Sequence, residues 1–143
     1  ALDYALEELQ RLAGEIHRDI GKRLNIRASE ILSTITDGKY YQLIVDDDLN
    51  MALLCEGRKI SAAKVSRGTI EQIYFCLRMA AAELLHEEQL PIILDDTFAY
   101  YDDSRMENTL RWLAEQDKQV LFFTCHTREV HVLERERMTY YRI

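Results

Sequence analysis

The chain has 143 residues, enough for one domain or one lobe of a larger one, and its 48% hydrophobic content is ordinary for a protein with a buried core. Its 18 basic and 25 acidic residues give a net charge of −7, which argues against a module that coats nucleic acid over its whole surface. No apolar run approaches the ~18 residues of a membrane span and no signal peptide opens the sequence, so we expect a cytoplasmic protein without membrane contact, in which Cys55, Cys76 and Cys125 are reduced core residues.

Residues 1–36 predict one long helix. Apolar residues in its first half occupy the a and d positions of about three heptads, which is typical of a coiled coil. After Ile20 the spacing slips by the equivalent of a four-residue stutter, so we expect the second half to pack on its own domain. The chain begins inside the pattern without a capping residue, which suggests a longer coil. The two heptad series are Leu2, Leu9, Ile16 and Leu6, Ala13, Ile20, and the residues after the stutter are Leu24, Ala28, Ile31 and Ile35.

Asp37-Gly38 predicts the end of this helix. The segments 40–45 and 51–55 then predict an antiparallel hairpin, joined through the acidic turn 46–50. Glu56-Gly57 turns the chain into a third short strand near Ile60. These strands make up a small antiparallel part of the fold.

The rest of the chain alternates helices and strands. A helix is predicted over 69–86, with Thr69 and Gln72 at capping-box spacing, and a buried strand over 90–95. A helix over 104–116, with Ser104 and Glu107 as a second capping box, leads to a strand over 120–125. Because a helix joins two strands, we expect a parallel βαβ unit. A short helix over 127–133 and a last strand over 138–143 follow.

Four short motifs occur in this part of the sequence. Val-Ser-Arg-Gly-Thr at 65–69 opens a helix, and Ile-Ile-Leu-Asp-Asp at 92–96 ends a strand in two carboxylates. Ala-Tyr-Tyr-Asp at 99–102 follows, and His126 comes directly after the strand 120–125. In open α/β folds ligands gather at the carboxyl ends of parallel strands, so we expect metal or phosphate chemistry at this end.

In this order the motifs resemble the signature motif, Walker B motif, D-loop and H-loop of the carboxyl-terminal lobe of an ABC-type ATPase head. With the preceding coiled-coil helix, the chain is most similar to SMC-like coiled-coil ATPases, which include double-strand-break repair ATPases and the bacterial YhaN type. The resemblance implies an α/β fold: half of an ABC ATPase head, with a parallel βαβ core and a small antiparallel part. Residues 1–36 would be the end of the coiled coil and residues 37–143 the ATPase lobe.

The resemblance also implies ATP and Mg²⁺ as cofactors and assigns roles to the motif residues. Asp95 would hold Mg²⁺, since a hard cation beside phosphates prefers oxygen ligands. Asp96 would orient or deprotonate the attacking water, although most ABC enzymes carry Glu at this position. His126 would donate a hydrogen bond to a γ-phosphate oxygen. ATP held by an opposite head would be contacted by Ser66, Arg67, Gly68, Thr69 and Asp102, with Thr69 replacing the glutamine common in transporter signatures.

The sequence contains no P-loop. Its only Gly-Lys, Gly38-Lys39, lacks both the preceding glycine and the following Ser or Thr. In the family that the chain resembles, the P-loop lies in an amino-terminal lobe, beyond a long coiled coil. We therefore expect an ATPase that is inactive as this chain alone, needs that lobe, and joins a second head on ATP. DNA and a nuclease subunit are further expected partners, in DNA repair or chromosome maintenance.

Two other classes of function stay open. The chain could be a non-catalytic interaction module, in which a coiled-coil stub is attached to a degenerate ATPase lobe. It could also be a receiver-like domain with Asp95 or Asp96 as phosphoacceptor. A receiver carries its acidic pair after its first strand, whereas here most of the domain precedes the pair.

Two apparent metal motifs are incomplete. The turn beginning at Asp46 resembles the start of an EF-hand loop, but Met51 and Gly57 replace the required glycine and glutamate. Cys125, His126 and His131 are metal-ligand types, yet no fourth ligand or CxxC pair accompanies them, so the sequence predicts no zinc site.

Overall fold

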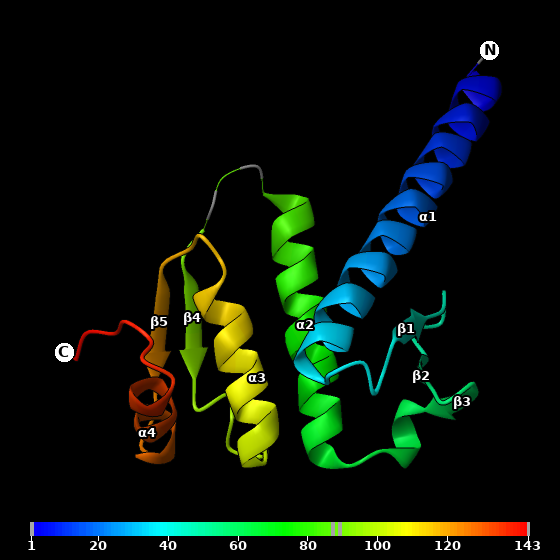
Figure 1. The fold of residues 1–143 in the computed structure, drawn as a ribbon. Coiled ribbons are helices and arrows are strands. Elements are labelled where there is room, and N and C mark those ends of the chain that lie inside the picture. Colours follow the sequence, from blue (N-terminus) through cyan, green and yellow to red (C-terminus); the bar gives the residue numbers. More distant parts are fainter. Residues whose placement is uncertain (1, 87, 89, 143) are drawn as a thin grey trace.

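The computed structural model describes residues 2–86, 88 and 90–142, with described side chains beginning at Ala5. A long helix, α1 (Leu2–Ile35), projects from a body that contains a small antiparallel sheet and a parallel βαβ unit (Figure 1). The α/β arrangement expected from the sequence is therefore confirmed. The side chain of Leu2, in the first heptad, lies outside the described part.

The two halves of α1 differ in burial, as the stutter predicts. Leu9 and Ile16 are 64% and 60% exposed on the projecting half. Ala28, Ile31 and Ile35 are fully buried, because the second half packs against α2 (Arg67–Leu85) and the first strand. The prediction that only the part after the stutter packs on its own domain is confirmed.

The antiparallel sheet follows the predicted turn. Asp37 and Gly38 have φ angles of 50° and 75°, and the Gly38 amide donates to the Ser33 carbonyl at 2.8 Å, which closes α1 with a left-handed turn. The strands β1 (Gln42–Val45), β2 (Met51–Cys55) and β3 (Arg58–Ser61) pair in the order β1-β2-β3. A short 3₁₀ helix, η1 (Ala62–Lys64), leads from β3 towards α2.

Polar side chains of α1 pair with the edge strand β1. The side-chain nitrogen of Asn25 donates to the Val45 carbonyl, and its side-chain oxygen accepts from the Val45 backbone amide, both at 3.0 Å. Ser29 Oγ accepts from the Leu43 amide at 2.9 Å. Because an edge strand otherwise leaves its backbone groups unpaired, these contacts fix the sheet against the helix.

The acidic hairpin turn is stabilised by one side chain. Asp46 Oδ1 accepts from the backbone amides of Asp48 and Asn50, at 3.0 and 2.8 Å, and Oδ2 accepts from the Asn50 side chain. These hydrogen bonds hold the pKa of the Asp46 carboxyl below its ordinary value, and the bond from the Asn50 side chain has the largest effect. The acidic run thus acts as an Asx-type turn.

Helix α2 starts two residues earlier than expected. Ser66 is its N-cap and accepts the Thr69 amide at 3.3 Å, so the predicted capping box of Thr69 and Gln72 is wrong. The Gln72 side chain is buried, and neither of its polar atoms has a hydrogen-bond partner among the described residues. A serine with extended backbone directly before the helix is the better cap, since its hydroxyl reaches the free amides.

The parallel unit consists of β4 (Ile92–Asp95), α3 (Asp103–Ala114) and β5 (Val120–Phe123), followed by α4 (Arg128–Arg135). β4 and β5 pair in parallel with Asp95 opposite Phe123, as the βαβ prediction requires. Helix α3 is capped by Asp102, which accepts the Arg105 amide at 2.9 Å. The capping box of Ser104 and Glu107 is therefore wrong, and Glu107 instead forms ion pairs with arginines.

Two expectations about the parallel sheet are also wrong. Ile92 and Leu94 face the core, but Ile93 is 67% and Phe123 of β5 is 55% exposed, so the sheet is buried on one face instead of both. Residues 138–142 form no strand, and Ile143 lies outside the described residues. The Met138 amide donates instead to Leu133 at the end of α4.

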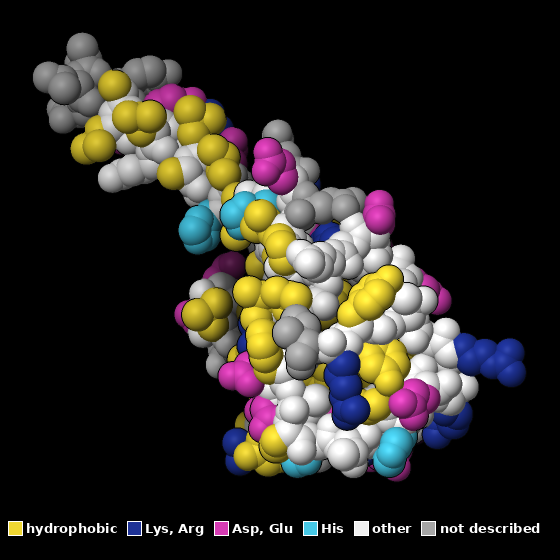
Figure 2. All heavy atoms as spheres, turned by 90° about the vertical axis from the view of Figure 1, so that its left-hand side faces the viewer, with side chains coloured by type: hydrophobic (Ala, Val, Ile, Leu, Met, Phe, Trp, Pro, Cys, Tyr) yellow, Lys and Arg dark blue, Asp and Glu magenta, His cyan; other side chains and the backbone are white. Residues whose placement is uncertain are grey.

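The core lies where α2 and α3 pack against the second half of α1 and the inner face of the parallel sheet. Phe75 of α2 meets Trp112 of α3 edge-on at 5.8 Å, and Phe98 packs on Phe122 at 5.1 Å. Figure 2, viewed from the β5 side, shows hydrophobic side chains on the body as well as along the projecting helix. No helix within the described ranges combines the length and apolar character needed to cross a membrane.

Candidate functional site

The predicted site residues gather at one end of the body. The amino-terminal ends of α2, α3 and α4 and the carboxyl ends of β4 and β5 all lie at the lower end in Figure 1. Helix starts carry free amides and positive dipole, and strand ends here carry carboxylates and a histidine. Within this end, the side chains form one group at the strand ends and another at the start of α2.

The strand-end group contains Asp95, Asp96 and His126, all exposed. Asp96 has a φ of 46°, and its amide donates to the Phe123 carbonyl at 2.9 Å, which continues the β4–β5 pairing past the strand end. The His126 amide donates to Thr124 Oγ1 at 3.0 Å. Asp96 and His126 ligand atoms lie within 4.8 Å of each other, so the expected convergence on one sheet edge is found.

Cys125 joins this group. Its Sγ lies 3.8 and 3.7 Å from the two carboxylate oxygens of Asp96. The prediction that all three cysteines are core residues is wrong for Cys125, which is exposed, whereas Cys76 is buried and Cys55 half-buried. Burial raises the pKa of the Cys76 thiol well above its ordinary value.

At the start of α2, the four signature-like residues differ in accessibility. Ser66 and Arg67 are exposed, whereas Gly68 and Thr69 are buried. The Ser66 hydroxyl lies 3.0 Å from Thr69 Oγ1, and the Arg67 guanidinium stacks over the Tyr100 ring at 3.8 Å from its centroid. Of these four residues, Ser66 and Arg67 therefore present side chains to a ligand.

Gly68 is in close contact with the loop that joins β4 to α3. A Cβ atom on Gly68 would lie 2.5 Å from the Tyr100 carbonyl oxygen and 2.6 Å from Arg105 Nη1. The glycine is thus needed for the approach of the chain's own backbone. The contact of Gly68 with ATP of an opposite head, which the resemblance implies, stays a prediction.

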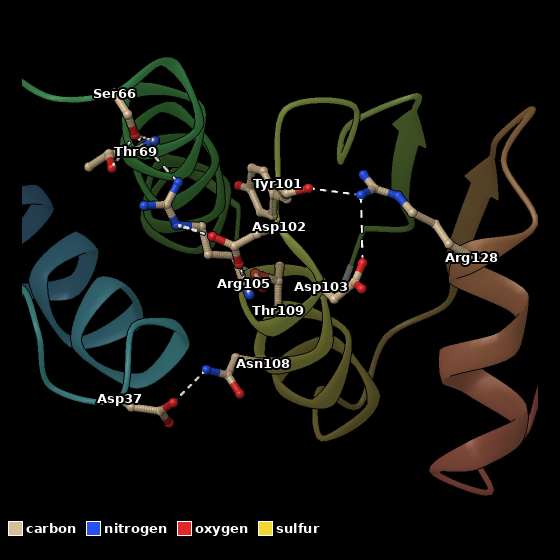
Figure 3. A network of polar contacts seen from close by, with 10 residues as sticks. All are labelled: Asp37, Ser66, Thr69, Tyr101, Asp102, Asp103, Arg105, Asn108, Thr109 and Arg128. Atoms are coloured by element: carbon tan, nitrogen blue, oxygen red, sulfur yellow. Dashed lines mark hydrogen bonds and ion pairs between the residues drawn. The ribbon is translucent and has the colours of Figure 1, made fainter.

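Arg105 connects the two motifs that meet here. Its Nη1 donates to Ser66 Oγ at 3.4 Å, and its Nε forms an ion pair with Asp102 Oδ2 at 3.3 Å (Figure 3). Asp102, predicted to contact ATP, caps α3 in this structure. Sequence reasoning missed Arg105. Its helical spacing from Asp102 was readable, but its contact with Ser66 spans 39 residues.

Arg128 holds the other side of the same loop. Its guanidinium donates to the Tyr101 carbonyl at 2.9 Å and lies 3.8 Å from Asp103 (Figure 3). It also donates to the Phe98 carbonyl. Tyr101 is buried, and burial raises the pKa of its hydroxyl. The 99–102 loop is therefore fixed between α2 and the start of α4, a restraint that the sequence did not reveal.

The donor set of this end fits the implied cofactors. Asp95 and Asp96 present exposed carboxylate oxygens, the ligands that Mg²⁺ prefers. The free amides at the start of α2, the Ser66 hydroxyl and the Arg67 and Arg105 guanidinium groups suit a polyphosphate. The strand ends can therefore hold a metal ion, and the start of α2 can bind phosphate oxygens.

No family model matches the chain, but a curated protein does. The chain is 36% identical over 110 residues to the uncharacterized protein YhaN of Bacillus subtilis (strain 168). The match covers 73% of this chain and 11% of YhaN, so the chain spans about a tenth of that relative's length.

Solved structures of SMC proteins are also similar. A chain from work on ATP-driven dimerization and DNA-stimulated activation of SMC ATPases has a TM-score of 0.70 at 13% identity, covering 82% of this chain and 76% of that one. A second similar structure is the Smc head domain of Pyrococcus furiosus, which has an extended coiled coil and is bound to the carboxyl-terminal domain of ScpA. Its TM-score is 0.60 at 13% sequence identity, and the match covers 92% of this chain and 37% of that one. The SMC head domain of Thermotoga maritima has a TM-score of 0.58 at 18% sequence identity, and the match covers 83% of this chain and 44% of that one.

Proposed function

Because this chain has the fold of the carboxyl-terminal half of an SMC-like ATPase head, we propose that it is that lobe of a head that binds and hydrolyses ATP. In this proposal residues 1–36 end a coiled coil and residues 37–143 form the lobe. The observation that carries it is the meeting of Asp96 and His126, from the ends of neighbouring parallel strands, within 4.8 Å. A carboxylate and an imidazole placed so close can act on the same small reactant.

Each strand-end residue has a role in the proposed reaction. Asp95 would hold Mg²⁺, which when bound neutralises negative charge on the phosphates. Asp96 would accept a proton from the attacking water or orient it. His126 would donate a hydrogen bond to a phosphate oxygen. Asp96 is one methylene shorter than the glutamate of most ABC enzymes, and its backbone is fixed by the hydrogen bond from its amide to the Phe123 carbonyl.

The start of α2 would face ATP held by a second head. Ser66 and Arg67 are exposed there, and Arg105 adds positive charge beside Ser66. Gly68, Thr69 and Asp102 would act with them, although their described contacts are within the chain. Since the 99–102 loop is packed on Gly68, movement at the start of α2 would be transmitted to the strand end.

The open sheet face supports an additional lobe. Ile93 and Phe123 leave large apolar side chains exposed on the outer face of β4 and β5, which is costly unless another surface covers it. We assign this cover to a P-loop lobe of the same protein, and YhaN, with nine-tenths of its length outside the match, is long enough to contain one.

The projecting half of α1 supports a coiled coil. Leu6, Leu9, Ile16 and Ile20 are exposed at heptad spacing, and such a stripe is stable only against a second helix. The resemblance extends the proposal to a second head as homodimer partner on ATP, and to DNA and a nuclease subunit in DNA repair or chromosome maintenance.

The proposal is tested by joining the chain to the P-loop lobe of its own protein through a short linker. We expect steady-state ATP turnover by the joined protein and none by the 143-residue chain, because the chain has no P-loop to hold the β-phosphate. An Asp95→Asn version of the joined protein is the background control. Turnover by the chain alone would contradict the proposal, and ATP-dependent association without turnover would favour the non-catalytic module.

Ser66→Asp in the joined protein separates nucleotide contact from helix capping. Aspartate is as good an N-cap as serine, so the melting temperature should change little, but its charge should repel the opposing γ-phosphate. We therefore expect ATP-driven head association, measured by sedimentation, to weaken strongly. Ser66→Ala is the matched control: it should lose about 1 kcal/mol of stability and retain most of the association. If the heads of the Ser66→Asp variant associated normally on ATP, the γ-phosphate of the opposite head would not lie beside Ser66.

A further inference from the structure

The strand-end group contains one side chain that the proposed hydrolysis does not use. This side chain is Cys125, and one ligand atom from each of Asp96, Cys125 and His126 lies within 4.8 Å of the others. All three are exposed, so an ion can reach them from solvent. The sequence predicts no zinc site, because no further ligand accompanies Cys125, His126 and His131. The fold supplies such a ligand, since it brings the Asp96 carboxylate from the end of β4 to Cys125 and His126.

The distance from the Cys125 sulfur to the Asp96 carboxylate oxygens fits a tetrahedral ion. With Zn–S and Zn–O bonds of about 2.3 and 2.1 Å, a tetrahedral angle places the sulfur and oxygen about 3.6 Å apart. Cys125 Sγ lies 3.7 Å from one carboxylate oxygen of Asp96 and 3.8 Å from the other. Either oxygen can therefore serve as ligand with little movement of the two side chains.

Backbone contacts fix the residues that carry these ligands. The Asp96 amide bonds to the Phe123 carbonyl at 2.9 Å, and the His126 amide bonds to Thr124 Oγ1 at 3.0 Å. The Asp96 backbone is therefore positioned by the sheet, and the His126 backbone by a hydrogen bond within the segment that follows β5. Binding would cost mainly the rotamer freedom of three short side chains.

We propose that Asp96, Cys125 and His126 bind Zn²⁺, with water as the fourth ligand. The thiol of Cys125 releases its proton to solvent on binding, since the thiolate is the ligand. Thiolate and imidazole select a transition metal over Mg²⁺, which prefers an all-oxygen set such as that offered by Asp95. A bound Zn²⁺ would occupy Asp96 and His126, and would so inhibit ATP turnover. This last consequence rests on the proposed function, whereas binding does not.

Binding is tested on the 143-residue chain with Co²⁺ and Zn²⁺. We expect a thiolate-to-Co²⁺ charge-transfer band in the near ultraviolet that Zn²⁺ abolishes, at one equivalent per chain. Cys125→Ser should remove the band and weaken Zn²⁺ binding, measured by competition with a chromogenic chelator. Removal of an outer-shell partner lowers metal affinity by about 10–100-fold, and loss of the Cys125 ligand should lower Zn²⁺ affinity by at least as much.

Matched variants identify the ligands. Asp96→Asn and His126→Ala should each weaken Zn²⁺ binding, whereas Cys55→Ser and His131→Asn, which change the same residue types elsewhere, should not. Serine at position 125 retains a hydrogen-bond donor to Asp96, so a cysteine that only donates that bond predicts unchanged Zn²⁺ affinity. Absence of the band, or equal affinity in Cys125→Ser and the parent chain, would overturn the site.

Inhibition is tested separately on the joined protein. Micromolar Zn²⁺ should lower its ATP turnover at saturating Mg²⁺, and Cys125→Ser should relieve this inhibition with little change in turnover without Zn²⁺. Zn²⁺ binding without inhibition would refute the regulatory consequence. A joined protein without turnover would refute the proposed function, and the spectroscopic result would still decide the metal site.

Discussion

Asp96→Asn in the joined protein is expected to lower ATP turnover by about 10²–10⁴-fold, which is the usual contribution of a general base. Asparagine has the shape of aspartate but cannot take a proton from water at neutral pH. ATP binding and head association should persist, because Asp95 still provides the carboxylate for Mg²⁺. Asp95→Asn should instead weaken Mg²⁺-dependent nucleotide binding.

The measurement combines steady-state turnover with equilibrium binding of a labelled nucleotide. Asp47→Asn is the matched control, since it makes the same change on an exposed residue of the hairpin turn, far along the chain from the strand ends. Its turnover should equal that of the parent. Near-normal turnover in Asp96→Asn would move the base to another residue and remove the main role assigned to the strand-end group.

The order and type of the elements could be predicted because local signals determine them. Heptad spacing predicted α1, Asp37-Gly38 predicted its end, and short apolar runs predicted β1, β2, β4 and β5. Helix starts were less predictable: capping-box spacing predicted caps at Thr69 and Ser104, whereas Ser66 and Asp102 cap the two helices. At α2 the choice between Ser66 and Thr69 depends on backbone conformation: Ser66 is extended, with φ −66° and ψ 157°, and only then can its hydroxyl reach the Thr69 amide.

Burial of the parallel strands could not be predicted from their composition. The run Ile-Ile-Leu suggests a strand covered on both faces, yet Ile93 points out of the body. Composition reports the environment that a strand has evolved for, and a covering surface can belong to another part of the protein. The exposed side chains of Ile93 and Phe123 are the observation on which the proposed P-loop lobe rests.

The candidate site was predictable only where strand topology determines it. Parallel strands end at the same edge of a sheet, so Asp95, Asp96 and His126 could be placed together in advance. The contacts of Arg105 with Ser66, of Arg128 with Phe98 and of Cys125 with Asp96 join residues 39, 30 and 29 positions apart. Such contacts depend on how the loops pack, and no short-range pattern encodes them.

The packing of the 99–102 loop on α2 predicts a large effect on stability for a small substitution. Gly68→Ala should lower the free energy of unfolding of the chain by about 1–3 kcal/mol, as overpacking usually does. The added methyl group would lie 2.5 Å from the Tyr100 carbonyl oxygen, and neither backbone can move away without disturbing the α2 cap or the loop. Urea unfolding followed by circular dichroism measures the change.

Gly21→Ala is a control of opposite sign. Position 21 also lies in a helix, α1, but a Cβ there meets nothing within 4 Å, so alanine should raise the stability by about 0.5–1 kcal/mol through lower backbone entropy. If Gly68→Ala were as stable as the parent chain, the close packing of the loop on α2 would be wrong.

The double variant Gly68→Ala, Arg105→Ala identifies the atom responsible. Arg105 Nη1 is the end of a flexible side chain and can withdraw, whereas the Tyr100 carbonyl belongs to a loop that Arg128 fixes from the other side. Most of the Gly68→Ala penalty should therefore persist when measured against Arg105→Ala alone. A penalty that disappears in the double variant would assign the clash to Arg105 and leave the loop free to move relative to α2.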